Sequence, residues 1–90
     1  MIMPISNNFM LKAVAGEYMI IPTSNNNVNF SKIFNINETG AFIFNKLKEG
    51  KNRNEILELL KKEYNATEAV LAADLDEFIN ELKKRGIYND

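Results

Sequence analysis

Asp74, Asp76 and Glu77 lie close enough together in this 90-residue sequence to suggest a binding site for a hard cation. An ion such as Ca²⁺ needs several oxygen ligands, which a loop turned by glycine usually supplies. No such loop surrounds these residues, and one helix cannot direct all three side chains at one ion. We therefore expect surface charges here, and the sequence predicts no metal site.

Glu55, Glu58 and Glu63 form a second acidic group. Carboxyl groups of this kind can act as the general acid and the general base of an enzyme. Lys61 and Lys62 lie in the same predicted helix, and this mixture of charges favours ion pairs on a solvated helix face. We interpret the group as exposed surface rather than as a catalytic site.

The chain contains no histidine and no cysteine. It therefore lacks the commonest general base, the commonest metal ligand and any thiolate nucleophile. These gaps argue against an enzyme, and we predict neither a catalytic residue nor a cofactor. The 11 basic and 12 acidic side chains leave a net charge of −1, which attracts neither a polyanion nor a membrane surface.

Targeting and anchoring segments are not apparent in the sequence. No apolar run approaches the ~18 residues that a membrane-spanning helix needs. Residues 1–8 lack the basic-then-apolar order of a signal peptide, and with Pro4 they are expected to form a flexible tail. We expect a cytoplasmic protein whose single domain covers residues 9–88.

The first half of the chain predicts three β-strands, over residues 9–15, 17–23 and 28–36. Gly16 can supply the positive φ of a tight hairpin turn, and Pro22 is expected to end the second strand. The hydrophobic pattern of the third run slips at Ser31 and Lys32, which a β-bulge would explain. The three runs predict an antiparallel meander.

The second half predicts three amphipathic helices. Asn37 and Asn52 are expected N-caps, and Glu55 completes a capping box with Asn52. Gly50 and Gly86 are placed to end the first and third helices. The predicted fold class is α+β, a three-stranded antiparallel sheet followed by three helices (βββααα), similar to a winged helix-turn-helix.

The same elements would suit a winged-helix regulator that binds DNA. Because phosphates dominate the affinity for DNA, its recognition helix should be basic. The predicted third helix, residues 67–85, carries five acidic and three basic side chains, and the basic ones are confined to its last turn. We therefore predict no nucleic-acid partner.

The predicted third strand lies at an open edge, because three strands in a meander cannot close into a barrel. Such an edge can accept an added peptide strand, with backbone hydrogen bonds supplying affinity and alternate side chains supplying specificity. The simpler alternative is an ordinary edge strand that Lys32 and the bulge protect from pairing. The residues alone leave both readings open.

Residues 11–22 read Leu-Lys-Ala-Val-Ala-Gly-Glu-Tyr-Met-Ile-Ile-Pro, and this stretch resembles the opening hairpin of the PqqD family. Residues 36–44, Ile-Asn-Glu-Thr-Gly-Ala-Phe-Ile-Phe, resemble the most distinctive stretch of the family, with Ile36 at the place of a leucine and Phe44 at that of a frequent tryptophan. Residues 74–86 resemble the closing helix, so the resemblance covers roughly residues 9–88.

The resemblance implies a non-catalytic recognition element for ribosomally synthesised precursor peptides. In the family, the leader of the precursor adds as a strand beside the third strand, in the groove between that strand and the third helix. The implied partners are the precursor peptide and a modifying enzyme, often a radical S-adenosylmethionine (SAM) enzyme. A purely structural subunit of a maturation complex is an alternative, and both a monomer and a weak or domain-swapped dimer are compatible with the sequence.

By position, the resemblance assigns peptide binding to the third strand and the facing side of the third helix: Val28, Asn29, Phe30, Ser31, Lys32, Ile33, Phe34, Val70, Leu71, Asp74, Leu75 and Phe78. Apolar residues at helical spacing usually belong to the core, so Leu75 and Phe78 are core candidates as well. Val70 and Asp74, at the border of the apolar stripe, are better groove candidates. Asn37 and Gly40 are expected to be structural, as a cap and as a point of close helix approach.

Overall fold

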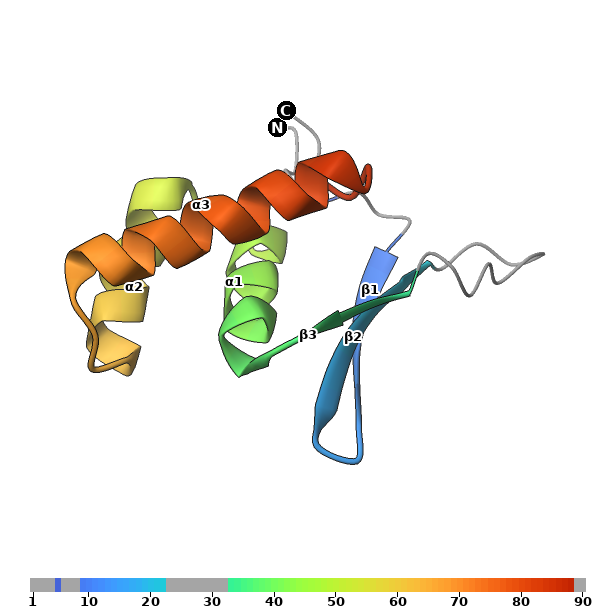
Figure 1. Ribbon diagram of the computed structural model, residues 1–90. Coiled ribbons are helices and arrows are strands. Elements are labelled where there is room, and N and C mark those ends of the chain that lie inside the picture. The colour runs from blue at the N-terminus through green and yellow to red at the C-terminus, as the bar shows by residue number, and fades with distance from the viewer. Residues whose placement is uncertain (1–4, 6–8, 23–32, 89–90) are drawn as a thin grey trace.

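The computed structural model describes Ile5 and residues 9–22 and 33–88. In these residues three strands precede three helices: β1 (Phe9–Val14), β2 (Glu17–Pro22), β3 (Phe34–Ile36), α1 (Glu38–Lys48), α2 (Arg53–Glu63) and α3 (Glu68–Lys84) (Figure 1). The strands form one antiparallel sheet in the order β1-β2-β3. The predicted α+β class and the order βββααα are confirmed.

A two-residue turn joins β1 to β2. Val14 pairs with Glu17, and Ala15 and Gly16 between them have φ angles of 52° and 81°. Positive φ at both central positions is typical of a type I′ turn, whose twist matches that of the flanking strands. The predicted hairpin is therefore present, and β2 ends at Pro22, which has no N–H to donate.

β3 is shorter in the described residues than the predicted strand over residues 28–36. It pairs with β2 through Phe34 opposite Ile20 and Ile36 opposite Tyr18, and Ile33 precedes it without belonging to a strand. Residues 28–32, with the expected bulge, lie outside the described residues. The strand ends at Ile36 because the next residue already caps α1.

The helix boundaries follow from caps that the sequence predicts. Asn37 Oδ1 accepts a hydrogen bond from the Gly40 N–H at 2.8 Å. Asn52 and Glu55 form a reciprocal capping box, with both hydrogen bonds at 2.9 Å. Gly50 follows α1 with a φ of 88°, the left-handed conformation that glycine adopts most readily at a helix end. These caps fix where α1 ends and α2 begins, and so fix the connection between them.

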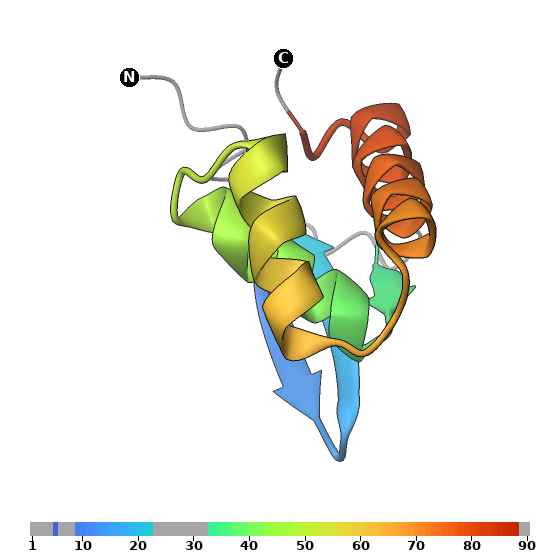
Figure 2. The same ribbon diagram turned by 90° about the vertical axis from the view of Figure 1, so that its left-hand side faces the viewer.

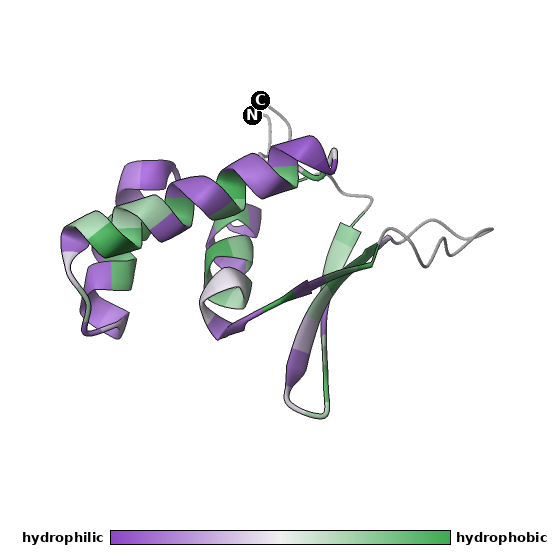
Figure 3. Ribbon diagram, in the orientation of Figure 1, coloured by the Kyte–Doolittle hydropathy of each residue, from purple (hydrophilic) through white to green (hydrophobic). Residues whose placement is uncertain are grey.

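The helices lie on one side of the sheet, and α3 crosses α1 and α2 (Figures 1 and 2). Hydrophilic and hydrophobic bands alternate along α3, as expected for an amphipathic helix (Figure 3). Its apolar stripe packs into a core of buried residues that includes Ile20, Ile43, Phe44, Leu47, Ile56, Leu60, Leu71, Leu75, Ile79, Leu82 and Ile87. The sheet joins this core through the side of the strands that carries Ile20 and its neighbours across the sheet, Leu11 and Phe34.

Ile5 also belongs to the core, although residues 1–8 were expected to form a tail. Its side chain is 2% exposed, and its backbone forms an antiparallel bridge with Tyr88. A single apolar residue in a short segment carries no periodic signal, so the sequence does not predict this contact. The bridge connects the start of the described chain to its end.

Candidate functional site

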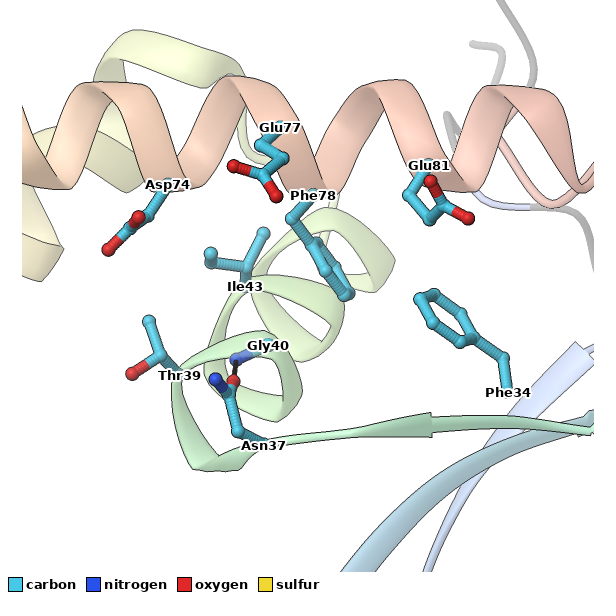
Figure 4. Close-up of a pocket in the computed structure, with 9 residues that line it drawn as sticks. All are labelled: Phe34, Asn37, Thr39, Gly40, Ile43, Asp74, Glu77, Phe78 and Glu81. Carbon is cyan, nitrogen blue, oxygen red and sulfur yellow. Dashed lines mark hydrogen bonds between the residues drawn. The ribbon is translucent and has the colours of Figure 1, made fainter.

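A groove of about 380 Å³ lies between β3 and α3, beside the start of α1 (Figure 4). We call it the α3–β3 groove. Its lining comes from the strand, from the first turns of α1 with the cap that precedes them, and from one face of α3: Phe34, Asn37, Thr39, Gly40, Ile43, Asp74, Glu77, Phe78 and Glu81.

Two aromatic rings connect the walls of the groove. The ring of Phe34 stacks with that of Phe78, with 6.3 Å between centroids and an interplanar angle of 20°. The guanidinium of Arg85 lies 3.9 Å from the centroid of Phe34, within the range of a cation–π contact. Arg85 Nε also donates to Glu81 Oε1 at 3.2 Å. Phe34 is thus held against α3 at two points along the helix.

Gly40 allows α1 to approach α3 closely at the base of the groove. A Cβ atom at this position would lie 3.0 Å from Phe78 Cε1 and 3.2 Å from Ile36 Cβ, closer than most Cβ contacts. Any larger residue would therefore push the ring of Phe78 away from α1. The expectation that Gly40 permits a close helix approach is confirmed, and both Asn37 and Gly40 also line the groove.

Three carboxylates, those of Asp74, Glu77 and Glu81, stand along the α3 wall (Figure 4). Glu81 pairs with Arg85, whereas Asp74 and Glu77 have no ion-pair partner within the described part of the chain. Elsewhere on α3, Asp76 receives bidentate hydrogen bonds from Arg53, and these bonds hold the pKa of the Asp76 carboxyl below its ordinary value. The groove therefore has an acidic wall that the described residues do not neutralise.

β3 has one free edge, because it pairs with β2 alone among the described strands. The β-turn makes Val14 and Glu17 a hydrogen-bonded pair. Along an antiparallel ladder, hydrogen-bonded pairs alternate with non-hydrogen-bonded pairs. Ile20 is three residues beyond Glu17, so it forms a non-hydrogen-bonded pair with Leu11 and directs its N–H and C=O away from β1. These groups therefore exchange hydrogen bonds with Phe34 on β3. The next residue, Asn35, consequently directs its N–H and C=O away from the sheet, where an added strand can pair with them.

The opposite edge of the sheet, at β1, differs in two ways. Lys48 Nζ donates a hydrogen bond of 2.8 Å to the carbonyl of Phe9, so one of its outward acceptors is already occupied. No residue of β1 lines the α3–β3 groove. An added strand at β3 would have both backbone groups and a groove for its side chains, whereas one at β1 would lack this groove.

The structure brings together three of the residues predicted for peptide binding: Phe34, Asp74 and Phe78 all line the groove. Leu71 and Leu75 are 3% and 0% exposed and belong to the core. Their place on the inward face of α3 leaves no surface for a peptide.

The other predicted positions lie away from this lining. Val70 is 52% exposed but does not line the groove. Ile33 is half-buried just before β3, and Val28, Asn29, Phe30, Ser31 and Lys32 lie outside the described residues.

Several groove residues were not predicted as site residues: Thr39, Ile43, Glu77, Glu81 and, at its end, Arg85. Three α3 positions, 77, 78 and 81, and the C-cap position 85 follow Asp74 at helical spacing, which places them on one face. That pattern is visible in the sequence. In the sequence alone the acidic residues of this helix only argue against DNA binding, because no local pattern places β3 against this face.

Other kinds of site are not supported in the described residues. They contain no group of three or more His, Cys, Asp or Glu side chains arranged to hold a metal ion. Their helices include none that is both long and apolar enough to cross a membrane. The α3–β3 groove and the adjoining strand edge are thus the site that the geometry favours.

Two solved structures share this fold. One is described as "TbiB1 in Complex with the TbiA(beta) Leader Peptide", with 22% identity, a TM-score of 0.78 and coverage of 97% of this chain and 95% of that one. The other is described as "Lasso peptide synthetase B1 complexed with the leader peptide", with 15% identity, a TM-score of 0.76 and coverage of 96% and 95%. The chain matches no curated protein.

Fold and site together define a small α+β domain with an open strand edge beside a helix-lined groove. Residues 9–87 match the family described as "Coenzyme PQQ synthesis protein D (PqqD)". The chain belongs to the PqqD family, and the resemblance noted in the sequence is confirmed.

Proposed function

We propose that this protein is a non-catalytic recognition element that binds the leader of a ribosomally synthesised precursor peptide. The open edge of β3 beside the α3–β3 groove is the observation that carries the proposal. Both structural neighbours are complexes with leader peptides, which supports the same role here.

Strand addition divides the binding energy between backbone and side chains. Asn35 offers one outward N–H and one outward C=O, and each hydrogen bond nets about 0.5–1.5 kcal/mol. Backbone pairing of this size does not distinguish one peptide from another. Side chains of the added strand alternate between its two faces, so every second one can enter the groove and determine which peptide binds.

The second role in the proposal is delivery of the bound leader to a modifying enzyme. Membership of the PqqD family suggests a radical SAM enzyme, whereas one structural neighbour is itself described as a lasso peptide synthetase. Affinity purification of the tagged protein from its own cells, followed by identification of the enzyme that co-purifies, distinguishes these two classes. We place the protein in the cytoplasm, as a monomer or a weak dimer.

Titration calorimetry of the isolated domain tests the proposal. The ligands are synthetic N-terminal segments of the short open reading frames found near the gene for this protein, and we expect one of them to show saturable binding at one site without any enzyme present. A domain that binds the enzyme but not the leader would instead be a structural subunit. Binding to duplex DNA with a steep salt dependence would identify a regulator, which the acidic α3 wall disfavours.

A further inference from the structure

Among the described residues, the α3 carboxylates that have no ion-pair partner lie on the side of the helix that faces the groove. Away from the groove, Asp76 pairs with Arg53, and Glu68 accepts a hydrogen bond of 2.7 Å from Lys61. Asp74 and Glu77 have no such partner among the described residues, although they lie on the same helix. Glu81, the third carboxylate of the groove, pairs with Arg85, so the unpaired charge on the groove side of α3 belongs to Asp74 and Glu77.

The acidic and aromatic parts of the groove lie along α3 in a defined order. Asp74 stands over Thr39 at one end, and Phe34 and Phe78 face each other toward the other end (Figure 4). Asp74 and Phe78 are one helical turn apart, a rise of about 6 Å. Side chains on one face of an added strand repeat about every 6.7 Å, so two such side chains match these two parts.

The N-terminus of α1 lies at the acidic end and carries a partial positive charge of roughly half a unit. Glu38 in the first turn and the Asn37 cap offset this charge. The carboxylates of Asp74 and Glu77 on the α3 wall outweigh the remaining partial positive charge of the α1 N-terminus. The end of the groove beside Asp74 therefore favours a cation.

Building on the proposed leader binding, we infer that the groove selects peptides in which a lysine or arginine lies two residues from a bulky apolar side chain. The basic group contacts Asp74 and Glu77, while the apolar side chain packs against Phe34 and Phe78. An acidic residue in place of the basic one would meet two like charges and be rejected, which makes the acidic wall a determinant of specificity.

The test is selection from a displayed library of random peptides on the immobilised domain. The selecting proteins are the wild type, the double variant Asp74→Asn/Glu77→Gln, and the matched control Glu58→Gln/Glu63→Gln. The control removes the same charge from the exposed face of α2, outside the groove. All four positions are exposed, so we expect the variants to fold with unchanged circular dichroism and thermal midpoint.

Wild type and control are expected to enrich peptides with lysine or arginine two residues from an aromatic or branched apolar residue. The double variant should lose the basic preference and keep the apolar one. For one selected peptide, replacing the basic residue with glutamine should weaken binding to wild type by about threefold to fivefold at low salt, and should not change binding to the double variant.

Selected peptides without a basic preference, or with the same preference on the double variant, would overturn the inference and leave leader binding standing. A selection that recovers no binding peptide from the wild-type domain would contradict the proposed function as well.

Discussion

Phe34, on the edge strand, stacks on Phe78, in the middle of α3, with 6.3 Å between the ring centroids. The two residues are far apart in the sequence, and their contact holds the free edge of the sheet beside a helix. Both rings are only partly buried and face the groove. The pair therefore contributes both to the packing of the domain and to the surface that a peptide would meet.

Replacing Phe78 with alanine should affect both properties. Loss of a partly buried aromatic side chain is expected to lower the free energy of unfolding by about 2 kcal/mol. The affinity for the leader peptide should fall about tenfold, because the apolar wall of the groove is lost. Urea unfolding and calorimetric titration measure the two effects.

Asn52→Ala is the matched control for this variant. It removes the capping box of α2, away from the groove, and should cost about 1 kcal/mol of stability without changing the affinity. If both variants weakened binding equally, the loss would reflect general stability rather than the groove.

Replacing Asn35 with proline tests the backbone of the β3 edge. Proline is tolerated at an edge position whose N–H faces solvent, so the domain should stay folded. Because the outward donor is lost and the proline ring obstructs an incoming strand, the affinity for the leader should fall at least about tenfold. Asn35→Ala keeps the N–H and should bind within about twofold of wild type; calorimetry that finds both variants equally impaired would argue for a side-chain role of Asn35.

Gly40→Ala tests the close contact between α1 and Phe78. Alanine favours helix by about 1 kcal/mol relative to glycine, and this gain opposes the clash of its Cβ with the Phe78 ring. We expect a small net change in the thermal midpoint but weaker peptide binding, because the displaced ring enters the groove. In a double-mutant cycle with Phe78→Leu, the Gly40→Ala substitution should lose most of its effect on affinity; an unchanged effect would mean that the ring is not involved.

The pair of Arg53 and Asp76 predicts how stability depends on pH. Because hydrogen bonds from Arg53 lower the pKa of folded Asp76, its stabilisation is present above the ordinary aspartate pKa of about 3.9 and is lost as the pH falls through the lower folded value. The stability difference between wild type and Asp76→Asn should thus be constant near neutral pH and shrink below about pH 4. Urea unfolding across pH 2–7 measures it, and a difference that persists at the acid end would mean that the ion pair is not its source.

The elements of the fold are largely predictable from local chemistry. Asn37 and Asn52 cap helices because their short side chains reach the backbone N–H groups of the first turn. Gly16 and Gly50 adopt positive φ where the chain turns. Each of these positions depends on neighbours within four residues, which is why the sequence is sufficient to locate them.

The site was harder to predict because it depends on contacts between distant segments. Helical spacing does not show which side of α3 faces β3, so buried Leu75 and groove-lining Asp74 both remained candidates. The contacts of Arg85 with Phe34 and of Ile5 with Tyr88 join residues far apart in sequence, and no local sequence pattern predicts them. The family resemblance indicated a strand and a helix as the peptide-binding elements, and the structure shows which of their side chains line the groove between them.

Amide hydrogen exchange, followed by NMR with and without a saturating leader peptide, tests strand addition at β3 most directly. We predict that the N–H of Asn35 becomes strongly protected on binding, while the N–H groups on the outward edge of β1 keep their exchange rates. Protection at the β1 edge, or an Asn35 amide that still exchanges freely in the saturated complex, would contradict the account.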